Sequence, residues 1–307
     1  MKKIHLDTDI GGDMDDMCAL AMIARWPDLE ITGVTTVSDD GGRRAGYAAY
    51  VLKLAGRTGV PVAAGADVSL ECYRFKPGYP DEQADWPEPV ARLPGSLDDA
   101  LALLKRSIEA GAALVAAGPY TNFALLDQKY PGILKDADLY LMGGRIYDPP
   151  PGYPSWANDF DYNIQLDIGS AQYVLEHGHP TLIPLAMSCQ TALRQAYLPA
   201  LAQAGRLGQL IVRQAEACAK EYHNETEYGE RFPGLPKDII NFQHDPLACA
   251  IALGWRDGVT IETVPLRFEV RDGALYEIPD AHCIPTRVVT AIDGNAFNAY
   301  WRDIICG

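Results

Sequence analysis

The sequence has few basic residues for its length. Its 26 Lys and Arg residues stand against 41 Asp and Glu residues, which gives a formal net charge of -15. Surfaces that bind nucleic acids or anionic membranes need clusters of basic side chains. We therefore expect no nucleic acid and no membrane as a partner, and we expect any nucleoside-like ligand to be small and nearly neutral.

Paired cysteines and long apolar runs are also missing. The seven cysteines are scattered without a C-x-x-C pair, and an odd number cannot all form disulfides within one chain. No apolar stretch at the start has the make-up of a signal peptide, and no run of about 18 apolar residues predicts a membrane span. These absences predict a cytoplasmic protein with reduced thiols.

What the sequence does contain is a regular alternation of short β-branched runs and longer helix-like stretches. Such alternation predicts an α/β fold with an open, mostly parallel central sheet and flanking helices, here as a single domain over residues 1–307. The section from about residue 259 is strand-rich and ends in a helix near 294–305. The runs expected to form the parallel strands are residues 4–9, 31–37, 60–65, 113–118, 139–144 and 181–187.

Two stretches are expected to be long loops. Residues 73–94 and 147–161 are both crowded with proline, aromatic and acidic side chains. Long loops in compact domains often cover a functional site, so the first of these is predicted to lie over one.

The first predicted strand runs directly into DTDIGGDMDD, which places five aspartates within ten residues: Asp7, Asp9, Asp13, Asp15 and Asp16. So many ionised carboxylates cannot share a small volume without a cation or raised pKa values. Ca²⁺ and Mg²⁺ prefer oxygen ligands and resolve the repulsion. The alternative is a solvated acidic loop that caps the following helix. An EF-hand does not fit, because Gly11 replaces its fifth ligand and Cys18 its final Glu.

This opening, with the helix MCALAMI after it, resembles the signature of the inosine-uridine nucleoside hydrolase family. Further segments match in the family's order: GVTTVSDD, PVAAGAD, AAGPYTNFALL, LYLMGG, DYNIQLD and NFQHDPLACA. The resemblance implies an N-ribohydrolase that releases free base and ribose from ribonucleosides. It also implies a Ca²⁺ cofactor, a nucleoside substrate and assembly as a homodimer or homotetramer.

Carried over residue by residue, the resemblance assigns two groups of site residues. The implied calcium ligands are Asp9, Asp16, the backbone carbonyl of Thr121, and Asp245. The residues implied to bind the ribose are Asp15, Asp161 and Asn163, with Asp40 standing where many members have Asn. Asp13 is additional to the shorter family signature, and Asp161 stands where Glu is usual.

Cleavage of an N-glycosidic bond passes through an oxocarbenium-like transition state and needs both an activated water and a stabilised leaving base. Asp9 is the expected proton acceptor and His244 the expected acid. Tyr222 and Tyr228 are possible contacts to the base.

Plainer interpretations exist for three of these positions. Thr121 is in a position to begin a helix, Asp245 to cap one, and His244 to serve a structural role. At the level of the whole protein, the alternatives are a catalytically idle Ca²⁺ or riboside-binding protein and a metal-dependent phosphohydrolase.

Overall fold

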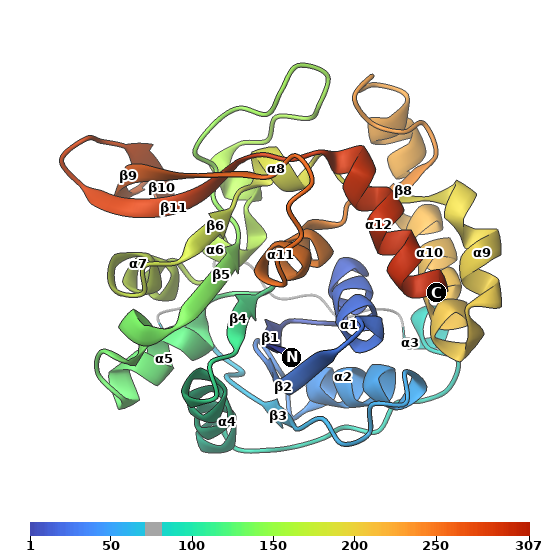
Figure 1. The fold of residues 1–307 in the computed structure, drawn as a ribbon, viewed down its shortest axis with the longest axis horizontal. Helices are drawn as coiled ribbons and strands as arrows, with labels where there is room; N and C mark the ends of the chain where they lie inside the picture. The colour runs from blue at the N-terminus through green and yellow to red at the C-terminus, as the bar shows by residue number, and fades with distance from the viewer. Residues whose placement is uncertain (71–81) are drawn as a thin grey trace.

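The computed structural model describes residues 1–70 and 82–307 and is built around one nine-stranded sheet (Figure 1). Its strands are β1 (Lys2–Thr8), β2 (Leu29–Thr36), β3 (Val62–Ala64), β4 (Ala113–Ala116), β5 (Asp138–Met142), β6 (Thr181–Ile183), β9 (Thr260–Arg271), β10 (Ala274–Pro279) and β11 (Ile284–Ala291). Two further strands, β7 (Leu193–Arg194) and β8 (Ile239–Asn241), form a small separate sheet.

The large sheet is mostly parallel. Its order is β10-β9-β11-β6-β5-β4-β1-β2-β3, and all pairs from β11 to β3 are parallel. Only the β9–β11 and β9–β10 pairs are antiparallel. The predicted parallel α/β architecture is therefore confirmed, and the strand-rich C-terminal section extends one edge of the same sheet.

Helices cover both faces of the sheet (Figure 1). One face packs against α4, α5 and α7, and the other against α1, α2 and α11, with α12 packed on α1 farther from the sheet. The helices are α1 (Asp15–Arg25), α2 (Arg43–Leu54), α3 (Glu82–Asp85), α4 (Leu97–Glu109), α5 (Thr121–Lys129), α6 (Tyr162–Leu166), α7 (Ile168–His177), α8 (Leu185–Ser188), α9 (Leu198–Gln203), α10 (Gly205–Tyr222), α11 (His244–Ala252) and α12 (Gly294–Cys306).

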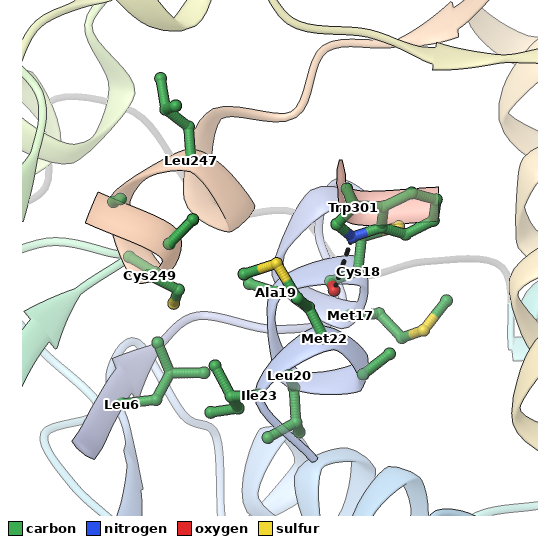
Figure 2. Packing of buried hydrophobic residues seen from close by; sticks show 14 of the residues in the cluster. Leu6, Met17, Cys18, Ala19, Leu20, Met22, Ile23, Leu247, Cys249 and Trp301 are labelled. Atoms are coloured by element: carbon green, nitrogen blue, oxygen red, sulfur yellow. Dashed lines mark hydrogen bonds between the residues drawn. The ribbon is translucent and has the colours of Figure 1, made fainter. Parts of the chain in front are cut away.

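Helix α1 lies in the middle of the larger core (Figure 2). Its residues from Asp15 to Ala24 are all buried, which agrees with the nearly uninterrupted apolar run of its sequence. It packs against α11 and α12, and the Trp301 indole N–H of α12 donates to the Cys18 carbonyl at 3.3 Å. This packing fixes the position of the helix N-terminus, where Asp15 and Asp16 lie.

The strand order reverses beside β1. From β1 the chain continues to β2 and β3 on one side and then returns to β4, β5 and β6 on the other. In open α/β sheets, ligands bind at the carboxyl ends of the strands where the order reverses in this way. The segments after β1 and β4 therefore border the expected ligand site.

Two expectations about individual segments need correction or restriction. The strand expected over residues 181–187 ends at Ile183, because Pro184 has no N–H for the ladder and the chain turns into α8. The long loop expected over residues 73–94 lies partly outside the described residues, which resume with the short helix α3. Among the helices of the described part, none has the length and apolar composition needed to cross a membrane.

Candidate active site

A cavity of about 410 Å³ opens at the carboxyl edge of the sheet. Residues that follow β1, β4, β5 and β6 contribute to its wall, so it lies at the point where the strand order reverses. Six carboxylates line it: Asp9, Asp13, Asp15, Asp16, Asp161 and Asp245. Aromatic side chains from Phe160, Tyr162 and Tyr222 also line it, and all three are partly exposed to solvent.

Three of the carboxylates form a compact buried cluster. Asp15 and Asp16 begin α1, Asp245 belongs to the first turn of α11, and one oxygen of each lies within 4.8 Å of the others. The Asp245 N–H donates to the Asp15 carboxylate at 3.3 Å. A cluster of buried oxygen donors with this spacing can hold a metal ion.

The electrostatics of the cluster favour a bound cation. Burial raises the pKa of Asp15, Asp16 and Asp245 well above the ordinary value, and the neighbouring carboxylates raise it further. A cation at this point would compensate the lost hydration and reverse the mutual repulsion. The donor set therefore fits a metal that prefers oxygen ligands.

Asp9 lies beside this cluster, where the chain leaves β1. Its side chain is 7% exposed and lines the cavity. Burial raises the pKa of Asp9, while the guanidinium of Arg44 acts in the opposite direction. Gly118, in the turn after β4, lies so close that a Cβ there would be 2.9 Å from the Asp9 Oδ1 atom.

Arg44 is a lining residue that the sequence did not single out. It is 1% exposed, and among the described residues of the cavity wall it is the only lysine or arginine. The sequence did hold a signal: Arg44 shares the helical spacing of the buried residues Tyr47, Ala48 and Val51, so it lies on the apolar face of α2.

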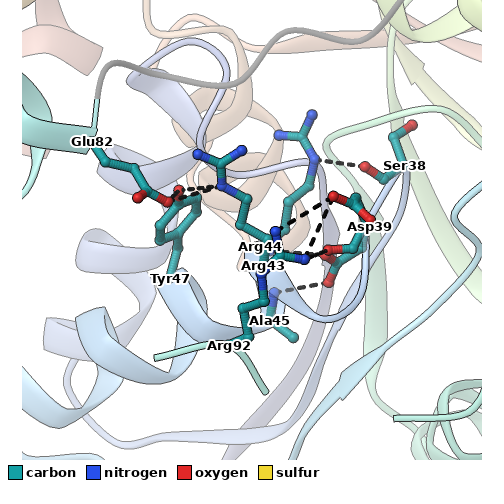
Figure 3. Close-up of polar contacts among 9 residues, drawn as sticks. Ser38, Asp39, Arg43, Arg44, Ala45, Tyr47, Glu82 and Arg92 are labelled. Carbon is teal, nitrogen blue, oxygen red and sulfur yellow. Dashed lines mark hydrogen bonds and ion pairs between the residues drawn. The ribbon is translucent and has the colours of Figure 1, made fainter. Parts of the chain in front are cut away.

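Asp40, by contrast, is not brought to the cavity. Its side chain is 70% exposed and pairs with Arg92 at 3.5 Å. The neighbouring Asp39 is buried and accepts the backbone N–H groups of Arg44 and Ala45 at the start of α2 (Figure 3). The expectation that Asp40 binds sugar therefore finds no support in its position.

Thr121 and Asn122 do not act as caps of α5. The residue before the helix is Tyr120, and no side chain caps this end. The Thr121 hydroxyl donates to Asp167 at 2.5 Å, and the Asn122 amide donates to Asp7 at 2.8 Å and to the Thr36 carbonyl at 2.9 Å. The Asn122 bonds hold the first turn of α5 against β1 and β2, and the Thr121 bond holds it against the start of α7.

The two residues expected on the far side of the sugar both line the cavity. The Asp161 carboxylate caps α6 through the Ile164 N–H at 3.1 Å and accepts the Gly144 N–H at 2.5 Å. Burial raises the pKa of Asp161 to about 6. The Asn163 amide donates to the Met142 carbonyl at 3.1 Å. Asp161 and Asn163 are therefore fixed by backbone contacts to β5 and to the segment just after it.

His244 and Tyr222 also line the cavity. His244 contacts the Ser188 hydroxyl through Nδ1 at 2.7 Å, and burial lowers its pKa to about 4. Tyr228 does not line the cavity, because it packs against Trp156, Phe232 and Phe242 one layer behind it. Asp13, unassigned by the sequence, lines the cavity and accepts the Asn241 amide at 2.7 Å.

Comparison with known proteins identifies the family. Residues 4–299 match the inosine-uridine preferring nucleoside hydrolases, which is nearly the whole chain. The chain belongs to this family. It is therefore a nucleoside hydrolase, an enzyme acting on N-glycosyl compounds, as its sequence motifs implied.

Among curated relatives, this nucleoside hydrolase is 28% identical over 265 residues to the pyrimidine-specific ribonucleoside hydrolase RihA of Klebsiella pneumoniae, covering 81% of this chain and 78% of the relative. The RihA of Salmonella schwarzengrund is 27% identical over 259 residues, with the same coverage of both chains.

Solved structures share the fold. A purine-preferring ribonucleoside hydrolase from Gardnerella vaginalis superimposes with a TM-score of 0.82 at 22% identity, covering 100% of this chain and 98% of that one. A plant nucleoside hydrolase superimposes with a TM-score of 0.79 at 19% identity, covering 100% and 99%.

Proposed function

We propose that this enzyme cleaves the N-glycosidic bond of ribonucleosides by attack of a water that Asp9 deprotonates and that a bound Ca²⁺ would activate. The observation that carries the proposal is the placement of Asp9 beside the buried cluster of Asp15, Asp16 and Asp245, inside one cavity. A volume of about 410 Å³ lies within the usual range for sites that enclose a small molecule.

The proposed calcium ligands are Asp9, Asp16, Asp245 and the Thr121 carbonyl. When bound, Ca²⁺ would lower the pKa of a coordinated water and hold two ribose hydroxyls. The oxygen-only donor set and its burial support this choice of metal. Thr121 follows the turn after β4, and its side chain is fixed by Asp167, which gives its backbone a defined position.

The remaining carboxylates would bind and orient the sugar. Asp15 faces Asp16 and Asp245 and is in a position to accept a ribose hydroxyl, while Asp161 and Asn163 line another part of the wall. Negative charge around the ribose stabilises the positive charge that develops there in the transition state. Asp9, with its carboxylate in the cavity, accepts the proton of the attacking water.

The base would lie toward His244 and the partly exposed aromatic side chains. Phe160, Tyr162 and Tyr222 offer surfaces on which a planar base can stack. Because burial lowers the pKa of His244 to about 4, the imidazole is neutral at pH 7 in the free enzyme. It would therefore act first as a hydrogen-bond donor to the base. Negative charge that develops on the departing base would raise the pKa of His244, so that the imidazole takes up a proton and can pass it to the base.

Chromatographic detection of free base and ribose from a panel of purine, pyrimidine and nicotinamide ribosides tests the proposal. Each reaction is run with Ca²⁺, with a chelator, and with Ca²⁺ restored after chelation. We expect chelator-sensitive release of base without release of phosphate. Failure to release base from every riboside, with Ca²⁺ bound, would overturn the proposed function, and chelator-resistant release would overturn the role of the metal.

A further inference from the structure

Arg44 is a buried arginine whose side chain reaches from α2 to the turn that carries Asp9. It is 1% exposed and lines the cavity. Arg43, the residue before it, points away from the cavity and pairs with Glu82 and Tyr47, each at 2.9 Å (Figure 3). Two neighbouring residues of one type thus have separate surroundings.

The Arg44 guanidinium joins two strand ends through their backbone carbonyls. Its Nε donates to the Ser38 carbonyl at 2.9 Å, in the turn after β2. Its Nη1 donates to the carbonyls of Asp9 and Ile10, in the turn after β1. A planar guanidinium holds several donors in fixed directions, so these bonds define the relative position of the two turns.

The other end of Arg44 is also fixed. Its backbone N–H donates to the Asp39 carboxylate at 2.9 Å, and the same carboxylate accepts the Thr36 hydroxyl at 2.7 Å. Ser38, whose carbonyl accepts from the guanidinium, has a φ of 53°, which a residue with a side chain adopts only where its surroundings hold it. The backbone of Arg44 and the Ser38 residue that accepts from its guanidinium are therefore both held in place.

A buried guanidinium loses hydration and persists only where acceptors and negative charge compensate the loss. Here the acceptors are main-chain carbonyls, and the negative charge is that of the aspartates lining the same cavity. Because the guanidinium bonds to the Asp9 carbonyl, it holds the backbone of Asp9.

We propose that Arg44 is a positioning residue that holds the Asp9 backbone, and through it the Asp9 carboxylate, in the place required for metal binding and for turnover. Catalytic groups must be held close to their productive geometry, since a misplacement of about 1 Å can lower the rate about 100-fold. The kinetic consequence rests on the proposed reaction, whereas the consequence for metal binding rests only on the proposed role of Asp9 as a calcium ligand.

The test compares Arg44→Lys and Arg44→Gln with the matched controls Arg43→Lys and Arg43→Gln. For each full-length protein, kcat and KM are measured with the best riboside, and the dissociation constant for Ca²⁺ alone is measured by calorimetry. All measurements are made well below the unfolding temperature of each variant. We expect both Arg44 variants to lose kcat by about 10- to 100-fold with KM within about threefold, and to bind Ca²⁺ more weakly. The Arg43 variants should match the wild type.

Several results would overturn the proposal. Wild-type kcat in Arg44→Lys would show that a positive charge alone suffices. Tighter Ca²⁺ binding in Arg44→Gln would show that Arg44 acts on the metal by charge repulsion and not by holding Asp9. A raised KM with unchanged kcat would make Arg44 a substrate contact, and a loss that merely follows the unfolded fraction would make it structural. If Arg44→Gln does not fold, Arg44→Lys decides. If the wild type cleaves no riboside, the proposed function fails, and the Ca²⁺ titration still tests Arg44.

Discussion

Asp9 differs from the other aspartates of the cavity in its surroundings. Asp15, Asp16 and Asp245 face one another within 4.8 Å, whereas Asp9 lies between this cluster, the Gly118 turn and Arg44. A carboxylate in this place is able both to bind a cation and to accept a proton from water. We therefore assign the base to Asp9 and not to the clustered carboxylates.

Replacing Asp9 by Asn should nearly abolish turnover while binding of the riboside persists. The amide keeps the size of the side chain but accepts no proton at neutral pH, and a general base contributes about 10²- to 10⁴-fold. We expect kcat to fall by about 1000-fold, measured as base released at saturating riboside and Ca²⁺. Riboside affinity, measured by calorimetry, should change by less than about tenfold.

Asp40→Asn provides the matched control, because it makes the same chemical change on an exposed side chain that pairs with Arg92. Its kcat should equal that of the wild type. An Asp9→Asn enzyme that retains a tenth of the activity, or an Asp40→Asn enzyme that loses most of it, would contradict the assignment.

The sequence predicted those site residues that lie close to one another in the chain or within a family motif. The aspartates from Asp9 to Asp16 lie in one short segment of the sequence, and Asp245 lies in a segment that matches a family motif. Arg44 escaped prediction because its partners, the Ile10 and Ser38 carbonyls, are backbone atoms that carry no signal of their own. Asp40 was expected at the cavity because it stands where many family members have Asn, whereas in the structure the buried residue of this pair is Asp39.

At the scale of elements, the ends of β1 and β4 approach each other more closely than side chains allow. Gly118 follows β4, and a Cβ there would lie 2.9 Å from the Asp9 Oδ1 and from the Val37 Cγ1. Real side chains do not approach so closely, so one of the turns must move if the glycine is replaced. The position of Asp9 thus depends on residue 118, after β4, being a glycine without a side chain.

Gly118→Ala should therefore lower activity although only one methyl group is added. The displaced Asp9 carboxylate would be misaligned, and we expect kcat to fall by about 10- to 100-fold. Gly59→Ala is the control, because a Cβ at that position meets nothing within 4 Å. Circular dichroism and thermal unfolding show whether each variant is folded. If Gly118→Ala and Gly59→Ala have equal kcat values, the close approach of Gly118 to Asp9 does not determine the position of the carboxylate.

His5 joins three elements and makes their packing sensitive to acid. This fully buried imidazole of β1 contacts the hydroxyls of Ser107 in α4 at 2.8 Å and of Thr35 in β2 at 2.9 Å. Burial lowers its pKa from 6.5 to about 3. Between these values the unfolded chain binds the proton and the folded protein does not, so stability falls as the pH falls below 6.5.

Urea unfolding of the wild type and of His5→Gln at pH 7.0 and pH 5.0 tests this sensitivity. At pH 5.0 the wild type should lose about 2 kcal/mol of unfolding free energy more than the variant does. Because the aspartates are common to both proteins, their contribution to the pH dependence cancels when the two changes in unfolding free energy are compared. Identical pH dependence in both proteins would show that His5 is not the group responsible.

The sequence predicted the elements well because each side of the sheet is buried. Strands covered on both faces are largely buried, which made β1, β2, β4 and β5 visible as short runs with mostly apolar or β-branched residues. The apolar run 181–187 was misread in its second half, since α8 is as buried as the strand before it. Burial without periodicity does not distinguish a short strand from a short helix.

At the scale of the whole molecule, the carboxylate cluster joins segments that are far apart in the chain. Asp15 and Asp16 begin α1, and Asp245 lies some 230 residues later at the start of α11. These helices pack together in the larger core, together with Trp301 of α12 (Figure 2). A cation bound by the cluster would therefore hold the N-terminal and C-terminal parts of the fold together.

This arrangement predicts that Ca²⁺ stabilises the folded protein. An ion that binds only the folded state at 100 times its Kd adds about 2.7 kcal/mol, which corresponds to a rise in Tm of about 4 °C for a chain of this size. Scanning calorimetry with Ca²⁺ and with a chelator measures the rise. In Asp245→Asn the rise should be largely lost, because one of the three clustered carboxylates is gone, whereas Asp98→Asn, at an exposed pair with Lys129, should retain it. An equal rise in Asp245→Asn would place the stabilising ion elsewhere, since the affinity of any other site would not depend on Asp245.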